Sequence, residues 1–248
     1  MDTGISQPAD RFAVALRRTR RLLAQAVERH APVALASSMG CEDMVLIDLV
    51  VRDRLAVDVF VLDTGRLHGE TYALIERTRD RYGLSLRLYA PEGDALEAFL
   101  SSHGPNAFYR SPELRKTCCA IRKIEPLARA LKGYGAWITG LRRAQSSERA
   151  DTAEWGWDAA NGLYKYSPLA AWSSDELWDY IRTRDVPYNP LHDQGYASIG
   201  CAPCTRAIAP GADERSGRWW WEEDDARECG LHVADGRVNR AVSAGEES

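Results

Sequence analysis

The chain has 248 residues, a formal net charge of -4 at pH 7 and a pI of about 5.8. This length suits one α/β domain with a sizeable core, and the acidic balance lacks the broad positive field that a nucleic-acid binder usually carries. The opening residues MDTGISQPADRFAV contain no apolar run of the signal-peptide kind, and no later stretch reaches the roughly 18 apolar residues of a membrane span. We therefore expect a cytoplasmic protein.

The first predicted element is an amphipathic helix over residues 11–30, where Phe12, Leu16, Leu23 and Val27 recur at helical spacing. After it, short apolar segments that predict strands alternate with longer segments that predict helices. The expected strands are 33–38, 57–64, 84–89 and 135–140, and the expected helices are 43–53, 69–83, 113–131 and 173–185. This alternation predicts an α/β fold with a mainly parallel sheet flanked by helices.

Regular patterns are weaker elsewhere. The stretch 151–163 is polar and bears tryptophans, which suggests an excursion from the α/β fold, and periodicity fades after Asp185. The end of the chain, from about Asp235, is small and polar and is expected to be disordered.

Three loops follow expected strands at the sheet edge where parallel sheets bind ligands: SSMGCED, DTGRLHGE and TGLRRAQSSER. The first, Ser37–Asp43, offers hydroxyls, backbone N–H groups and a helix N-terminus, which suit phosphate or sulfate. It lacks the Walker A pattern. The same residues also fit an ordinary turn with a good helix cap, and this alternative stays open.

Four of the six cysteines have the spacing of a metal site. Cys118 and Cys119 are adjacent, and Cys201 and Cys204 form C-x-x-C. Helical neighbours point about 100° apart, so an adjacent pair reaches separate metal atoms more easily than one zinc ion. This favours an iron–sulfur cluster. The alternative is that the first pair are small buried hydrophobic residues.

Two further features lie near the C-terminus. Cys229, in ARECGLH, has Arg227 and His232 close by and suits an activated nucleophile, although an incidental surface thiol has the same spacing. The run Trp219–Trp221 cannot face one core with all three rings, so we expect it to pack the tail against the domain beside functional arginines.

Taken in order, these motifs resemble the assimilatory adenylylsulfate reductases of the phosphoadenylylsulfate reductase superfamily. The carriers are SSMGCEDMVLIDL, VLDTGRLHGETY, the adjacent cysteines, WITGLRRAQS, VPYNPLHDQGYASIGCAPCTR, ERSGRWWWE and ECGLH, which together span 37–232. The resemblance implies an adenine nucleotide α-hydrolase-like fold. It divides the chain into a nucleotide-binding domain with the iron–sulfur site, 1–210, and a mobile C-terminal segment with the catalytic cysteine, 211–248.

The resemblance also implies roles for individual residues. The phosphosulfate end of the substrate would be held by Ser37, Ser38, Gly40, Asp43 and Arg149, and the adenosine would be bordered by Leu62, Asp63, Thr64, Gly65 and Gly140. The catalytic residues would be Cys229, Lys123, His232, Arg215 and Arg218. A four-iron four-sulfur cluster would be held by Cys118, Cys119, Cys201 and Cys204.

The implied reaction is reduction of adenosine 5'-phosphosulfate to sulfite and AMP, for sulfate assimilation and cysteine biosynthesis. Cys229 would form a thiosulfonate that thioredoxin or a similar dithiol resolves. A homo-oligomer is also implied. Cys41, which stands where the family often has alanine, is expected to be structural.

Three other functions remain as alternatives. A reductase for the 3'-phosphorylated nucleotide usually lacks the four cysteines. An RNA-thiolating iron–sulfur enzyme typically has an SGGxDS loop and binds RNA, which the acidic charge disfavours. A nucleotide-binding redox sensor stabilised by zinc or a cluster would not need Cys229.

Overall fold

The computed structural model describes residues 8–222, 233–234 and 237–238. One sheet contains six strands in the order β3-β2-β1-β4-β6-β5. They are β1 (Val33–Ser37), β2 (Val57–Leu62), β3 (Arg87–Tyr89), β4 (Ala136–Ile138), β5 (Trp155–Asp158) and β6 (Leu163–Tyr166). Neighbouring strands are parallel except at one edge, where β5 is antiparallel to β6. The predicted mainly parallel sheet is confirmed.

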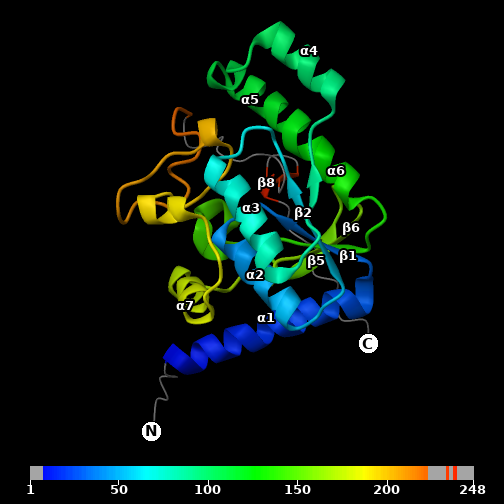
Figure 1. Cartoon of the computed structure of the whole chain (residues 1–248), viewed down its shortest axis with the longest axis vertical. Helices are drawn as coiled ribbons and strands as arrows, with labels where there is room; N and C mark the ends of the chain where they lie inside the picture. Colours follow the sequence, from blue (N-terminus) through cyan, green and yellow to red (C-terminus); the bar gives the residue numbers. More distant parts are fainter. Residues whose placement is uncertain (1–7, 223–232, 235–236, 239–248) are drawn as a thin grey trace.

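Helices cover both faces of this sheet (Figure 1). The α-helices are α1 (Pro8–His30), α2 (Cys41–Arg52), α3 (Gly69–Tyr82), α4 (Gly93–His103), α5 (Pro112–Cys119), α6 (Glu125–Leu131) and α7 (Ser174–Arg184). Because side chains alternate along a strand, Val33 and Leu35 of β1 pack in a core with α1, α2, α3 and α7, whereas Ala34 packs with α6.

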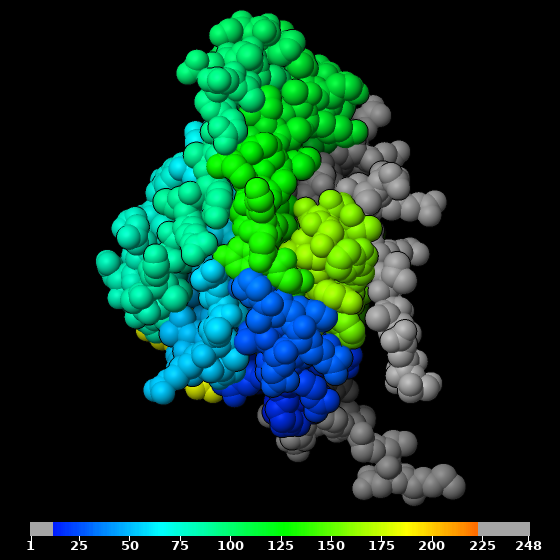
Figure 2. All heavy atoms as spheres, turned by 90° about the vertical axis from the view of Figure 1, so that its right-hand side faces the viewer, coloured from blue at the N-terminus to red at the C-terminus, as the bar shows by residue number. Residues whose placement is uncertain are grey.

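The molecule is longest between α1 and the pair α4 and α5. These two helices project at one end, and α1 lies at the opposite end (Figures 1 and 2). Within the described residues, no helix is long and apolar enough to cross a membrane.

The helix expected over 113–131 contains a π-helical segment, Ala120–Ile124, between α5 and α6. Glu125 donates its N–H to Ala120, five residues earlier. Pro126 explains the irregularity, because it has no N–H to donate to Arg122 in an α-helical pattern. The adjacent cysteines end α5, and Lys123 lies in the π-helical segment.

Some elements were not predicted. The stretch 151–163, expected to be an excursion rather than a boundary, contains β5 and the start of β6, which extend the sheet at one edge. Lys165 of β6 is buried, and its ammonium lies over the Trp137 ring, 5.2 Å from the ring centroid. Because a charged residue occupies a core position, the sequence of β6 lacks the run of apolar residues by which a buried strand is predicted. Helix α4 is also new.

Short elements complete the fold. The 3₁₀ turns are Ala107–Tyr109, Arg143–Gln145, Ser147–Arg149, Pro190–Gln194 and Ala202–Cys204. Strands β7 (Val233–Ala234) and β8 (Arg237–Val238) form a small hairpin. The hairpin includes part of the stretch that we expected to be disordered, and 239–248 lie outside the described residues.

Candidate active site

A pocket lies where β1, β2 and β4 end, at the sheet edge expected from the loop sequences. Most of the predicted substrate-site residues within the described chain line it. They are Ser37, Ser38, Gly40, Asp43, Leu62, Thr64, Lys123, Gly140, Arg149, Arg215 and Arg218. Residues far apart in the sequence therefore come together as the motifs predicted.

The loop between β1 and α2 forms the floor of the pocket. Asp43 closes it by accepting hydrogen bonds from the Ser38 N–H at 2.6 Å and the Ser38 hydroxyl at 2.7 Å. Met39 adopts a left-handed conformation, with φ of 60°, and donates its N–H to the Ser37 hydroxyl. Because α2 begins at Cys41, its first-turn N–H groups end at this loop, which suits an anion.

Asp43 has an unusual protonation behaviour. Burial raises the pKa of this carboxyl to about 7, despite hydrogen bonds from Ser38 and the Gly140 N–H that favour the charged form. The neighbouring charge of Glu42 adds to the rise. A partly neutral Asp43 repels an incoming anion less than a full carboxylate does.

The turn after β2 forms another wall. Leu62 and Thr64 line the pocket, whereas Asp63 accepts hydrogen bonds from the Gly65 N–H at 2.9 Å and the Tyr72 hydroxyl at 2.7 Å. Gly65 has φ of 66°, which glycine adopts without strain. Asp63 and Gly65 thus shape the turn without lining the pocket.

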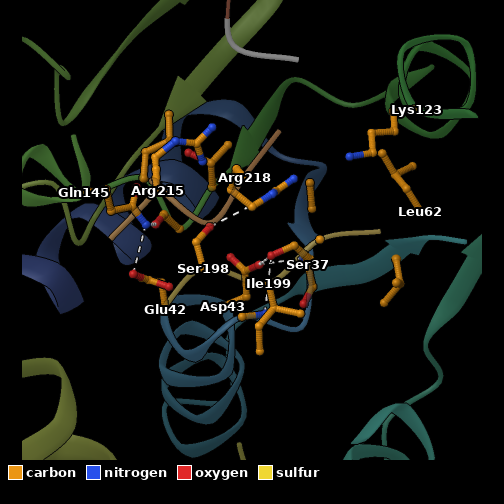
Figure 3. Close-up of a pocket in the computed structure, with 18 of the residues that line it drawn as sticks. Ser37, Glu42, Asp43, Leu62, Lys123, Gln145, Ser198, Ile199, Arg215 and Arg218 are labelled. Carbon is orange, nitrogen blue, oxygen red and sulfur yellow. Dashed lines mark hydrogen bonds between the residues drawn. The ribbon is translucent and has the colours of Figure 1, made fainter. Parts of the chain in front are cut away.

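Three arginines line the pocket, and two of them, Arg215 and Arg218, lie opposite the floor (Figure 3). Arg149 donates to the Gln145 side-chain oxygen at 2.6 Å, and Arg218 donates to the Ser198 hydroxyl at 3.4 Å. Arg215 and Arg218 both lie against the Trp219 ring. The guanidinium groups are thereby oriented for binding an anion.

The four cysteines gather at the end of the pocket near Lys123. Cys201 and Cys204 pack with Phe108 and Trp219, and Cys118 contacts this group. Cys119 is buried and close enough to Cys204 for its charge to affect that thiol. The Cys201 thiol also donates to the Thr64 hydroxyl at 3.3 Å, which links the cysteines to the pocket wall.

Positive charges surround the thiols. Burial raises the pKa of Cys201, but the charge of Lys123, the hydrogen bond with Thr64 and the nearby arginines together outweigh it. The pKa of this thiol therefore lies below its ordinary value. Burial raises the pKa of Cys204 to about 12. Among the described residues, no three histidine, cysteine, aspartate or glutamate side chains form a ready-made site for a single metal ion.

Two predicted catalytic residues, Cys229 and His232, lie outside the described residues. The run Trp219–Trp221 packs as expected: Trp219 is buried against the cysteines, and Trp221 contacts Phe108. Trp219 has φ of 45°, a strained conformation for a bulky residue.

Sequence reasoning missed a group of ion pairs beside the pocket. Arg142, in the loop after β4, binds two carboxylates, Glu42 and Glu214. Gly200 was also missed: a β-carbon there would lie 2.3 Å from the Arg218 guanidinium, so glycine makes room for that group. The spacing of residues in the sequence could not predict these contacts, because they join segments that are far apart in the chain.

Similar proteins identify the family of this chain. Residues 32–207 match the model of the phosphoadenosine phosphosulfate reductase domain. A protein from Burkholderia cepacia named adenosine 5'-phosphosulfate reductase is 52% identical, covering 90% of this chain and 89% of that protein. One of the same name from Allochromatium vinosum is 53% identical, covering 85% and 82%.

Solved structures show the same fold. A phosphoadenylyl-sulfate reductase from Candida auris has a TM-score of 0.66 at 25% identity, covering 82% of this chain and 98% of that one. Yeast FAD synthetase, at 17% identity and a TM-score of 0.57, covers 84% of this chain and 70% of that one and shares the fold alone. The resemblance predicted from the motifs is confirmed, and the chain belongs to the phosphoadenosine phosphosulfate reductase family.

Proposed function

We propose that this chain reduces adenosine 5'-phosphosulfate to sulfite and AMP in the cytoplasm, for sulfate assimilation and cysteine biosynthesis. The main support is that the four cysteines lie beside the pocket. Three arginines line this pocket and suit an anion, and the cysteines gather at its Lys123 end. The relatives named adenosine 5'-phosphosulfate reductase support the choice of substrate.

The chemistry begins with the Cys229 thiolate, which attacks the sulfur of the sulfate group. The bond from that sulfur to the bridging oxygen breaks, and AMP leaves with the electron pair. Arg149, Arg215 and Arg218 bind the anionic groups and offset the repulsion between thiolate and substrate. AMP is a good leaving group, because its phosphate carries the charge without a proton.

The second half of the reaction releases sulfite. One thiol of thioredoxin or a similar dithiol attacks the Cys229 sulfur and expels sulfite, and its second thiol resolves the mixed disulfide. The dithiol supplies both electrons and ends as a disulfide. We propose that His232 acts together with Cys229 in the first step.

A four-iron four-sulfur cluster held by Cys118, Cys119, Cys201 and Cys204 fits these residues. Four soft thiolates are the donors such a cluster requires, and Lys123, Arg122 and Arg218 supply positive charge beside Cys201. Bound there, the cluster would supply structural order and an electrostatic environment.

A second candidate is reduction of the 3'-phosphorylated nucleotide. The name of the matching family and that of the Candida auris structure favour it. Competition between the two nucleotides for the anaerobic enzyme decides between them: we expect a higher kcat/KM for the nucleotide with a free 3'-hydroxyl.

The decisive experiment is anaerobic incubation with sulfonucleotide that carries ³⁵S, without a dithiol. We expect label on the wild type and none on Cys229→Ser, with release as sulfite when thioredoxin is added. Cys41→Ala is the matched control. The Cys41 side chain is buried and is not part of the pocket lining, so its replacement should leave labelling intact. Absence of label on wild-type protein with intact iron would refute the proposal.

A further inference from the structure

The turn that carries two of the pocket arginines is tied to the domain by Glu214. This carboxylate accepts a hydrogen bond from Arg142 Nη2 at 3.0 Å and one from the Ser174 hydroxyl at 2.5 Å. Arg142 follows β4, and Ser174 begins α7. Glu214 is therefore held by two separate elements of the domain.

Arg142 extends this connection to the floor of the pocket. Its Nε donates to Glu42, in the first turn of α2, at 2.9 Å, and its side chain is only 2% exposed. A buried guanidinium costs free energy unless it is paired. The pairing fixes both carboxylates, so one cation joins the anion-binding loop to the arginine-bearing turn.

The turn itself transmits the position of Glu214. The Arg215 N–H donates to the Asp213 carboxylate at 2.8 Å, and the Arg218 N–H donates to the Arg215 carbonyl at 2.8 Å. Glu214 adjoins Arg215 in the chain. Because these hydrogen bonds join the turn internally, we expect a shift of Glu214 to move both arginines relative to the pocket floor.

Charge gives a second reason for this arrangement. Glu42 and Glu214 both line a pocket that should bind an anion. Carboxylates there would repel such a ligand, but both are paired with Arg142. The same guanidinium thus offsets one of the two negative charges and orients the turn.

We propose that Arg142 and Glu214 form a latch that positions Arg215 and Arg218 against the anionic groups of the sulfonucleotide. Glu214 is then a positioning residue, which acts through the arginines. The latch deepens the proposed function and rests on it for the identity of the ligand.

A double-mutant cycle tests the latch. Calorimetry of the iron-loaded protein measures the affinity for adenosine 5'-phosphosulfate in the wild type, E214A, R215A and the double variant. We expect E214A to weaken binding about tenfold, equal to about 1.4 kcal/mol. The loss should be clearly smaller when Arg215 is already alanine, because Glu214 then positions Arg218 alone. Equal losses in both backgrounds would overturn the proposal.

Matched variants separate positioning from general damage. E97A removes an exposed acid on α4 and should leave affinity unchanged. S174A removes a neutral hydroxyl that donates to Glu214 and accepts from Arg142, and it should cost less than E214A, because the ion pair of Glu214 with Arg142 remains. E214Q, which keeps the side-chain shape, provides a folded variant if E214A is unstable. It should also weaken binding, and wild-type affinity in folded E214Q would count against the latch.

The same series distinguishes the latch from the proposed function. Inorganic sulfate and AMP are titrated alongside the sulfonucleotide. If the wild type binds sulfate but no sulfonucleotide, the proposed function fails and the sulfate cycle decides the latch. If the sulfonucleotide binds and the losses are additive, the latch fails while the function stands.

Discussion

Gly140 lies so close to Asp43 that a β-carbon added to it would be 2.3 Å from the Asp43 Oδ1 atom. The same β-carbon would lie 2.8 Å from Cβ of Glu42. The loop after β4 and the first turn of α2 thus approach at a distance that only glycine permits. The Gly140 N–H also binds Asp43, so the contact holds two walls of the pocket together.

Replacing Gly140 by alanine should push these walls apart. We expect Gly140→Ala to lower the free energy of unfolding by about 1–3 kcal/mol through overpacking and to weaken nucleotide binding at least tenfold. Urea unfolding and calorimetry measure the two effects. Gly69→Ala is the control, because a β-carbon at Gly69 meets nothing within 4 Å. If both variants had the same free energy of unfolding and the same affinity, a β-carbon at position 140 would not force the two walls apart.

The raised pKa of Asp43 predicts that both the stability of the fold and its affinity for an anion depend on pH. Its pKa rises from 3.8 to about 7 on folding, so the folded state binds the proton more tightly than the unfolded state. The resulting stabilisation is complete below 3.8 and is lost as the pH rises through about 7. Stability should therefore fall over this window, and affinity for an anion should fall as Asp43 becomes charged.

Asp43→Asn tests this dependence because the amide does not titrate. Unfolding and binding curves across neutral pH should be flatter for the variant than for the wild type. Parallel curves for the two proteins would show that another group titrates there.

The sequence predicted this pocket because its signals are local. Loops rich in glycine, serine and threonine follow β1, β2 and β4, and parallel strands bring such loops to one edge. The Arg142–Glu214 pair, in contrast, joins residues 72 positions apart. The sequence offers many acidic residues that could pair with Arg142, so the actual partner is known only from the tertiary structure. Lys165 shows the same limit, since its buried position depends on Trp137 of another strand.

The cysteine set predicts an iron requirement. Cys201→Ser should lose iron, the visible absorbance of the cluster and sulfonucleotide reduction together, because one ligand is missing and the Thr64 contact changes. Cys229→Ser should lose activity but keep its iron. Metal analysis and absorbance of anaerobically purified protein check both. Full activity of iron-free Cys201→Ser would refute the cluster assignment.

Glu222 provides a test of what holds the tryptophan segment in place. Its carboxylate binds the Arg115 guanidinium at 2.6 Å, and the two side chains are 3% and 1% exposed. Arg115 also lies over the Trp219 ring, 4.6 Å from its centroid, and bonds to the Cys119 thiol. The pair therefore connects α5, which bears the adjacent cysteines, to the residue that follows Trp219–Trp221.

Removing one partner of such a pair leaves a buried charge without its main counterion. We expect Glu222→Ala to lower the free energy of unfolding by about 3–5 kcal/mol and to speed iron loss, because Arg115 contacts both Trp219 and Cys119. Glu92→Ala is the matched control. Its pair with Arg129 is exposed at 60% and 39% and should contribute at most about 1 kcal/mol. If urea unfolding gave the two variants the same stability, Glu222 would not anchor this segment, and the retention of iron would have to depend on the cysteines and Trp219 alone.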